Sequence, residues 1–127
     1  MSEKTIAQKL MIKEGQKVLF LDAPPGYEAA LGALPAKVQV LTKPTAAVDV
    51  IQVLVTSKKE LAGQLPGWKA ALRPRGILWI TYPKGTSKIK TDINRDTIRE
   101  YAASVGLQAV AIFSVDDTWA ALRLKVV

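Results

Sequence analysis

The chain has 127 residues, 49% of them hydrophobic and 23% charged, which suits one soluble domain with a single buried core. Its formal net charge of +7 favours anionic partners, although only as a non-specific attraction. The absence of cysteine and histidine excludes disulfides, thiolate nucleophiles, zinc fingers and imidazole bases, so any catalysis would use carboxylates, lysine, tyrosine or hydroxyl groups.

Four short β-branched or aromatic runs, bounded by glycine, proline or lysine, predict the first strands. Most are nearly continuous rather than alternating, which is typical of strands covered on both faces in a parallel sheet. The predicted strands are residues 17–23, 37–42, 48–55 and 76–83.

Helical patterns fill the segments between these strands. A short helix is predicted over 25–33 and a longer one over 58–72, which we expect Pro66 to split or kink. A third helix is predicted to begin near Asn94, a suitable N-cap, and to end at Gly106.

Two strands at residues 107–115 and 118–127 end the chain, and the short turn between them requires an antiparallel hairpin. The alternation of strands and helices before it specifies right-handed crossovers. We therefore predict a single three-layer Rossmann-like α/β domain over 1–127, with helices on both faces of a mostly parallel sheet of about six strands. The expected strand order is 2-1-3-4-6-5, with the last strand antiparallel beside the fourth.

No export signal or membrane span is expected. The N-terminal residues lack the continuous apolar core of a signal peptide. The longest uncharged apolar-rich stretch, residues 101–115, is interrupted by Gly106 and is too short to cross a bilayer as a helix. We therefore expect a cytoplasmic protein.

Several stretches resemble class I S-adenosylmethionine-dependent methyltransferases. The sequence "IKEGQKVLFLDAPPGY" stands where that superfamily has its first strand and glycine-rich loop, and "VDVIQVLV" where it has its fourth strand. "LRPRGILWITYPK" resembles the turn that leads into its fifth strand, and "AIFSVDDTWAALRLKVV" resembles its closing hairpin. The resemblance implies a methyltransferase-like fold.

A closer resemblance is to a small bacterial family classed as a domain of unknown function. It is carried by Pro83-Lys84, by Thr91-Asp92, and by Asp116 with Trp119, and it covers most of the chain. This family resemblance implies no particular activity.

The loop after the first predicted strand departs from the methyltransferase pattern. Its single glycine, Gly26, follows Pro24 and Pro25, which lack the N–H groups that a glycine-rich loop offers to a cofactor. The acidic residue that normally binds ribose after the second strand is replaced by Lys43. We therefore expect no cofactor and no specific binding of S-adenosylmethionine.

The same loop still contains three candidate ligand-binding residues. Asp22 would act as an acid or contact a cofactor, Gly26 would allow close approach, and Tyr27 would stack on a ligand ring. Each also has a structural interpretation, because an aspartate before two prolines can cap a turn and a tyrosine early in a helix can pack in the core. The adjacent aspartates 116 and 117 are interpreted as turn formers rather than a metal site, and no metal site is predicted.

A second candidate site is the basic loop after the fourth predicted strand. It lies at the carboxyl edge of the sheet, where open α/β sheets bind ligands, and we expect it to bind an anion. Its end, Asp92, is expected to help start the next helix. Arg73 and Arg75 are expected at the opposite end of that strand, so they do not belong to the site. The ligand-binding candidates of this loop are Lys84, Thr86, Ser87, Lys88 and Lys90.

These observations predict a non-catalytic α/β module that binds an anionic or phosphorylated small molecule or an acidic partner. A divergent S-adenosylmethionine-dependent methyltransferase using Asp22, Gly26 and Tyr27 is the first alternative. A nucleic-acid accessory protein is the second and less favoured one, because the basic residues do not form one patch. No membrane partner is expected.

Overall fold

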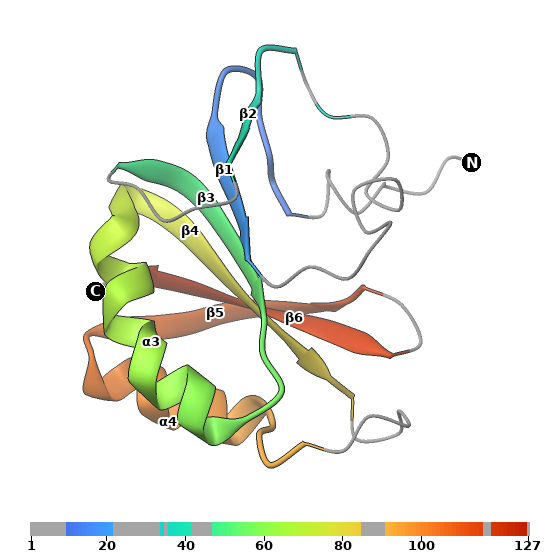
Figure 1. The fold of residues 1–127 in the computed structure, drawn as a ribbon, viewed down its shortest axis with the longest axis vertical. Coiled ribbons are helices and arrows are strands. Elements are labelled where there is room, and N and C mark those ends of the chain that lie inside the picture. The colour runs from blue at the N-terminus through green and yellow to red at the C-terminus, as the bar shows by residue number, and fades with distance from the viewer. Residues whose placement is uncertain are drawn as a thin grey trace.

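The computed structural model describes residues 10–21, 34, 36–41, 47–84, 91–115 and 118–126, which form six strands and two helices. Figure 1 shows their arrangement. The strands are β1 (Lys17–Leu21), β2 (Gln39–Leu41), β3 (Val48–Leu54), β4 (Leu72–Pro83), β5 (Leu107–Ser114) and β6 (Trp119–Val126). The helices are α3 (Lys58–Ala71) and α4 (Arg95–Ser104). The helix predicted over 25–33 lies outside the described residues.

All six strands form one sheet in the order β2-β1-β3-β4-β6-β5. The first four strands pair in parallel, whereas β6 is antiparallel to both β4 and β5. The predicted order, with the last strand inserted beside the fourth, is therefore confirmed. The fold is a mostly parallel α/β sheet that ends in an antiparallel hairpin.

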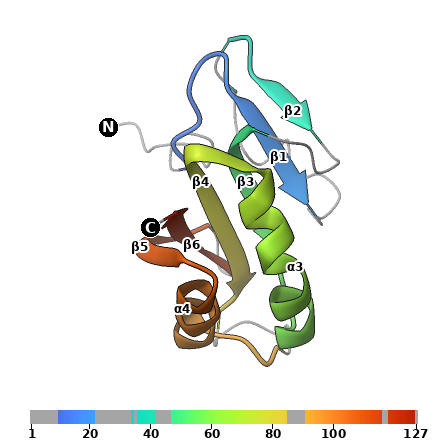
Figure 2. The ribbon, with the colours of Figure 1, turned by 90° about the vertical axis from the view of Figure 1, so that its left-hand side faces the viewer.

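The two described helices lie on the same side of the sheet, as Figures 1 and 2 show. They pack on the larger of two buried clusters, to which α3 contributes Leu61, Leu65 and Trp68 and α4 contributes Ile98. The opposite face is covered by a second cluster, which includes residues that precede β1. Trp79 belongs to this cluster, where its indole N–H donates to the Leu10 carbonyl at 2.9 Å.

Helix α3 runs through Pro66 without being split in two, so that part of the prediction is wrong. Pro66 lies on the exposed side of the helix and only removes its own N–H bond. The apolar side of α3 stays packed on the sheet, which compensates for the lost bond. The prediction for α4 is confirmed at its start, where the Asn94 side chain accepts from the Thr97 N–H at 3.0 Å.

Strand β4 begins at Leu72, four residues before the predicted start at Gly76. Its pairing with β3 jumps from Val48↔Leu72 to Val50↔Ile77, so the intervening residues form an irregular bend. A Cβ atom on Gly76 would lie 2.7 Å from Leu72 Cγ, which explains the glycine there. The predicted start at Gly76 is next to the point where regular pairing of β4 with β3 resumes, at Ile77.

No helix in the described part of the chain combines the length and the apolar character needed to cross a membrane.

Candidate functional site

The strand order creates a candidate ligand site at one edge of the sheet. The chain leaves β1 toward β2 on one side, whereas it leaves β3 through α3 toward β4 on the other. The carboxyl ends of β1 and β3 therefore flank a topological switch point, which is where open α/β sheets bind ligands.

The connection from β3 to α3 forms the described part of this edge. Ser57 is the N-cap of α3, and its hydroxyl accepts from the Glu60 N–H at 3.2 Å. This cap fixes the first turn of the helix, which holds the half-buried Glu60.

A clamp of Thr91 and Asp92 holds the same connection from the other side. The Thr91 hydroxyl donates to the Thr56 carbonyl at 2.6 Å, and Asp92 Oδ1 accepts from the Lys58 N–H at 2.7 Å. Asp92 therefore stabilises the N-terminus of α3, not the start of α4 as predicted. Asn94 already serves α4, which left the aspartate free for the more distant helix.

A hollow of about 420 Å³ opens at this edge, between the end of β3, the first two turns of α3 and the start of β6. Its volume falls in the range of small-molecule sites. The residues that line it combine an apolar floor, an aromatic ring, a hydroxyl, an amide and a carboxylate. They are Leu54, Trp119, Thr56, Gln64 and Glu60, named here the Glu60 hollow.

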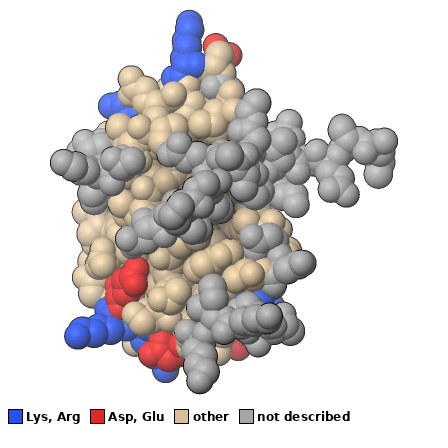
Figure 3. Space-filling model, turned by 45° about the vertical axis from the view of Figure 1, so that its right-hand side comes forward, with Lys and Arg blue, Asp and Glu red and all other residues tan. Residues whose placement is uncertain are grey.

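Charged side chains of both signs lie at the end of the molecule that carries this edge. Figure 3 shows them at its lower end, where β3 passes into α3 in Figure 1. Glu60 is the one carboxylate among the described residues that line the Glu60 hollow. The site can therefore accept a proton or a hydrogen bond from a bound molecule while Trp119 offers it an aromatic face.

Lys84 is the one predicted site residue that the structure describes, and it lies elsewhere. Its N–H donates to the Thr118 carbonyl at 2.7 Å, and its ammonium donates to the Ser114 hydroxyl. It lines a separate hollow of about 390 Å³ with Tyr82, where burial raises the pKa of the tyrosine. No described residue lines both this hollow and the Glu60 hollow.

The other predicted site residues lie outside the described residues, and their roles stay predictions. They are Asp22, Gly26, Tyr27, Thr86, Ser87, Lys88 and Lys90. Pro24, Pro25, Lys43 and Asp116 fall in the same undescribed segments. In the described part of the chain, no cluster of acidic side chains is suited to hold a metal ion.

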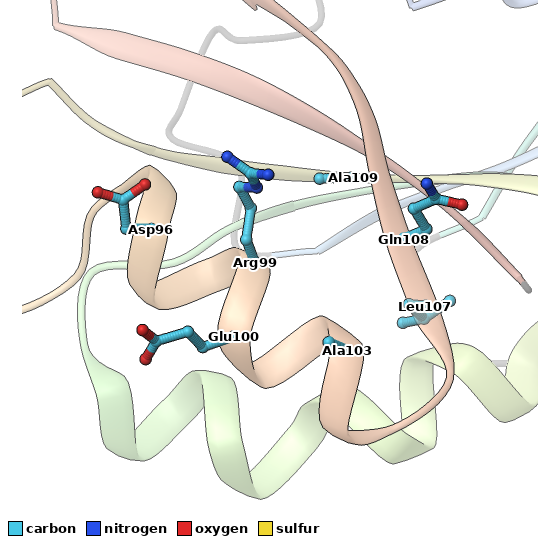
Figure 4. A pocket seen from close by; sticks show the side chains of 7 residues that line it. All are labelled: Asp96, Arg99, Glu100, Ala103, Leu107, Gln108 and Ala109. Atoms are coloured by element: carbon cyan, nitrogen blue, oxygen red, sulfur yellow. The ribbon is translucent and has the colours of Figure 1, made fainter.

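Another hollow, of about 520 Å³, lies away from the switch point. Figure 4 shows that it is bounded by α4 on one side and by the start of β5 on the other. Most of its lining side chains are exposed to solvent. It is therefore part of the open margin of the sheet rather than a site beside β1 and β3.

Asp49 is another polar group whose environment is unusual, but it lies at the amino end of β3. Burial alone would raise its pKa, yet the Lys17 N–H, at 2.8 Å, and the Arg73 guanidinium more than offset this and hold the pKa below its ordinary value. These contacts tie β1 and the bend of β4 to β3, so Asp49 has a structural role.

The sequence analysis missed Glu60 and Gln64 as functional candidates. A signal was present, because Ser57 and Glu60 have the spacing of a capping box and follow directly on a buried strand. That spacing places a carboxylate in the first turn of a helix at the carboxyl edge of the sheet. Trp119 was singled out, but only the strand order brings it to the same hollow as Leu54.

No family model and no curated protein matches this sequence. Solved structures do match its fold. A S-adenosylmethionine-dependent methyltransferase from Aquifex aeolicus is 16% identical, with a TM-score of 0.67 over 98% of this chain and 91% of its own. A TehB-like S-adenosylmethionine-dependent methyltransferase from Corynebacterium glutamicum is 14% identical, with a TM-score of 0.62 over 94% and 84%. DhpI in complex with SAH is 11% identical, with a TM-score of 0.65 over 94% and 81%.

These similarities overturn our main functional expectation. A non-catalytic module that binds an anion was predicted, whereas the structures that match the fold include enzymes that use S-adenosylmethionine. The error came from giving the missing loop glycines more weight than the fold. The methyltransferase alternative is the better supported one.

Proposed function

We propose that this chain is a divergent S-adenosylmethionine-dependent methyltransferase. The observation that carries the proposal is the match of nearly the whole chain to nearly the whole of the Aquifex aeolicus methyltransferase. At 16% sequence identity the match supports a common fold only, so the proposed function rests on the fold together with the Glu60 hollow.

The Glu60 hollow supports the proposal because its residues suit a methyl acceptor. S-adenosylmethionine, when bound, supplies an electrophilic methyl group. Trp119 and Leu54 would hold the apolar part of the acceptor, while Thr56 and Gln64 would orient its polar part by hydrogen bonds. The Glu60 carboxylate would accept the proton that the attacking nitrogen or oxygen loses.

The loop after β1 is the proposed cofactor site. The end of β1 lies at the switch point, and Asp22, Gly26 and Tyr27 are among the six residues that come after it in the sequence. This proposal replaces the expectation that no cofactor binds. Because Pro24 and Pro25 offer no N–H groups, the affinity for the cofactor is expected to be low for this fold.

A cytoplasmic location and a bacterial source, both expected from the sequence, are kept as parts of the same proposal.

The experiment is a methyl-transfer assay that measures S-adenosylhomocysteine release with a panel of small amine and hydroxyl acceptors. We expect turnover with at least one acceptor and a loss of about 100-fold or more in kcat for Glu60→Gln, because a positioned base contributes on that scale. Glu14→Gln is the matched control, because it removes an exposed carboxylate before β1 and should leave kcat unchanged.

Two results would count against the proposal. Equal turnover by the Glu60→Gln and Glu14→Gln variants would remove Glu60 from the reaction. No S-adenosylhomocysteine release with any acceptor, from protein shown to bind the cofactor, would leave a cofactor-binding protein without transferase activity.

A further inference from the structure

Gln52 is an unusual residue for the middle of β3. The other residues at positions 50–54 are all apolar, and the strand lies inside the sheet, between β1 and β4. Central parallel strands are usually built from aliphatic residues, because both of their faces are covered. Among the described residues, Gln52 and Thr81 are the two buried polar ones, and the exposed fraction of each is 0%. An aliphatic residue at position 52 would avoid the cost of burying an amide.

The side chains of Gln52 and Thr81 meet on the face of the sheet opposite to α3 and α4. Trp79, which is aligned with Gln52 on β4, belongs to the cluster on that face. The Gln52 amide donates from Nε2 to the Thr81 hydroxyl at 2.9 Å. Its Oε1 is buried and has no hydrogen-bond partner in the described part of the chain. A buried acceptor in this state has lost its water without replacement, which is unfavourable.

The unpaired oxygen belongs to an amide that lies under the switch point. Gln52 is aligned with Phe20, the second-to-last residue of β1, and stands two residues before the end of β3. Because Thr81 is aligned with Leu54, the bond to its hydroxyl draws the amide toward the carboxyl edge of the sheet. Gln52 is not among the residues that line the Glu60 hollow. The amide therefore lies below the β1 side of the switch point, where the chain continues into the proposed cofactor loop.

Thr81 holds the amide in place from a fixed position. Its carbonyl accepts from the Val55 N–H at 2.8 Å, which ties it to the chain that leaves β3. The hydroxyl that receives the Gln52 N–H is therefore anchored on the backbone of both strands. A buried polar pair held in this way has one defined orientation, so the free oxygen is presented in one direction.

We propose that Gln52 contacts the cofactor, with its Oε1 accepting a hydrogen bond from an amine or hydroxyl group of bound S-adenosylmethionine. This inference rests on the proposed function. The contact supplies the hydrogen bond that Gln52 lacks, so the amide stabilises the complex although it does not stabilise the protein alone. Because Gln52 is fully buried in this structure, the atoms that cover it must shift as the contact forms.

The first test measures binding and stability in a variant that removes both polar groups at similar volume, Gln52→Met with Thr81→Val. The free energy of unfolding in urea should stay the same or rise, because the unpaired oxygen is lost together with its hydroxyl partner. The dissociation constant of S-adenosylhomocysteine, measured by calorimetric titration, should rise about tenfold or more. Ile51→Met is the matched control, because Ile51 is buried on the other face of β3, and it should leave this constant unchanged.

Several results would overturn the inference. If the double variant binds S-adenosylhomocysteine as tightly as the unchanged chain, Gln52 has no role in the cofactor site, while the proposed function stands. If the KM for the methyl acceptor also rises in that variant, the contact belongs to the acceptor instead. A marked loss of stability would make the pair a structural one. An unchanged chain that does not bind S-adenosylhomocysteine would refute both this inference and the proposed function.

A second test changes Thr81 alone. Thr81→Ser keeps the hydroxyl that holds the Gln52 amide and should keep the affinity for S-adenosylhomocysteine. Thr81→Val removes that hydroxyl and should weaken binding, because the amide is no longer held in one orientation. Equal affinities of the two variants, measured at a temperature where both are folded, would show that the orientation of the amide does not matter and would contradict the inference.

Discussion

Replacing Asp92 by alanine should both destabilise the protein and loosen the Glu60 hollow. Asp92 Oδ1 accepts from the backbone N–H of Lys58, the first residue of α3, at 2.7 Å. The contact joins two segments far apart in the chain and satisfies one of the free N–H groups of the helix. The helix it secures carries Glu60.

The expected cost is about 1–2 kcal/mol, the scale of a lost helix cap with the favourable charge–dipole term at an exposed site. Unfolding entropy of about 2.1 cal/mol/K per residue over 127 residues amounts to about 0.27 kcal/mol/K. The melting temperature of Asp92→Ala should therefore fall by about 4–7 °C.

Thermal unfolding followed by circular dichroism measures this change, and Asp92→Asn is the control because its side chain keeps an oxygen acceptor. Asparagine caps helices about as well as aspartate, so most of the loss should be recovered. In the methyl-transfer assay at a temperature where both variants are folded, Asp92→Ala should also lower kcat. An Asp92→Ala variant as stable as the unchanged chain would refute the role of the clamp.

Three further outcomes are expected. Folding lowers the pKa of Asp49 from its ordinary 3.8, so its stabilising effect is complete above that pH and is lost as the pH falls through the folded pKa. The free energy of unfolding should therefore fall less steeply with decreasing pH below 3.8 in Asp49→Asn than in the unchanged chain, and equal slopes would contradict this. Gly76→Ala should cost about 1–3 kcal/mol in urea unfolding because its Cβ meets Leu72, whereas Gly63→Ala, in an open position of α3, should stabilise by about 0.5–1 kcal/mol; similar values for the two would contradict the role of Gly76. Trp79→Phe should cost about 1–3 kcal/mol because it leaves the Leu10 carbonyl without its buried donor, and an unchanged urea midpoint would argue against that bond.

The strand order could be predicted because the strand patterns and handedness rules leave few topologies. The continuous apolar run of β3 indicated a central parallel strand, and the short turn before Trp119 required a hairpin. Local signals also placed the start of α4 at Asn94. The break expected at Pro66 did not form because the apolar side of α3 packs on the sheet, whereas β4 begins before its predicted start because its first residues pair irregularly with β3.

The candidate site was harder to predict because its contacts are long-range. The clamp joins Thr91 to Thr56 and Asp92 to Lys58, and nothing local links these pairs. Asp92 comes just before α4 in the sequence, so the preference of helix starts for acidic residues assigned it to α4, whereas its side chain binds the N-terminus of α3. The lack of glycines in the loop after β1 could be read from the sequence. The hollow lined by Glu60 could not, because the residues that line it come together only in the fold.

The central claim is that the carboxyl edge beside β1 and β3 binds S-adenosylmethionine, and calorimetric titration of the purified chain tests it most directly. We predict saturable one-to-one binding, weakened by Gly26→Val and left unchanged by Glu60→Gln, because Glu60 is proposed to act on the acceptor and not on the cofactor. No saturable heat with either S-adenosylmethionine or S-adenosylhomocysteine, from folded protein at cofactor concentrations well above those in cells, would contradict the methyltransferase assignment.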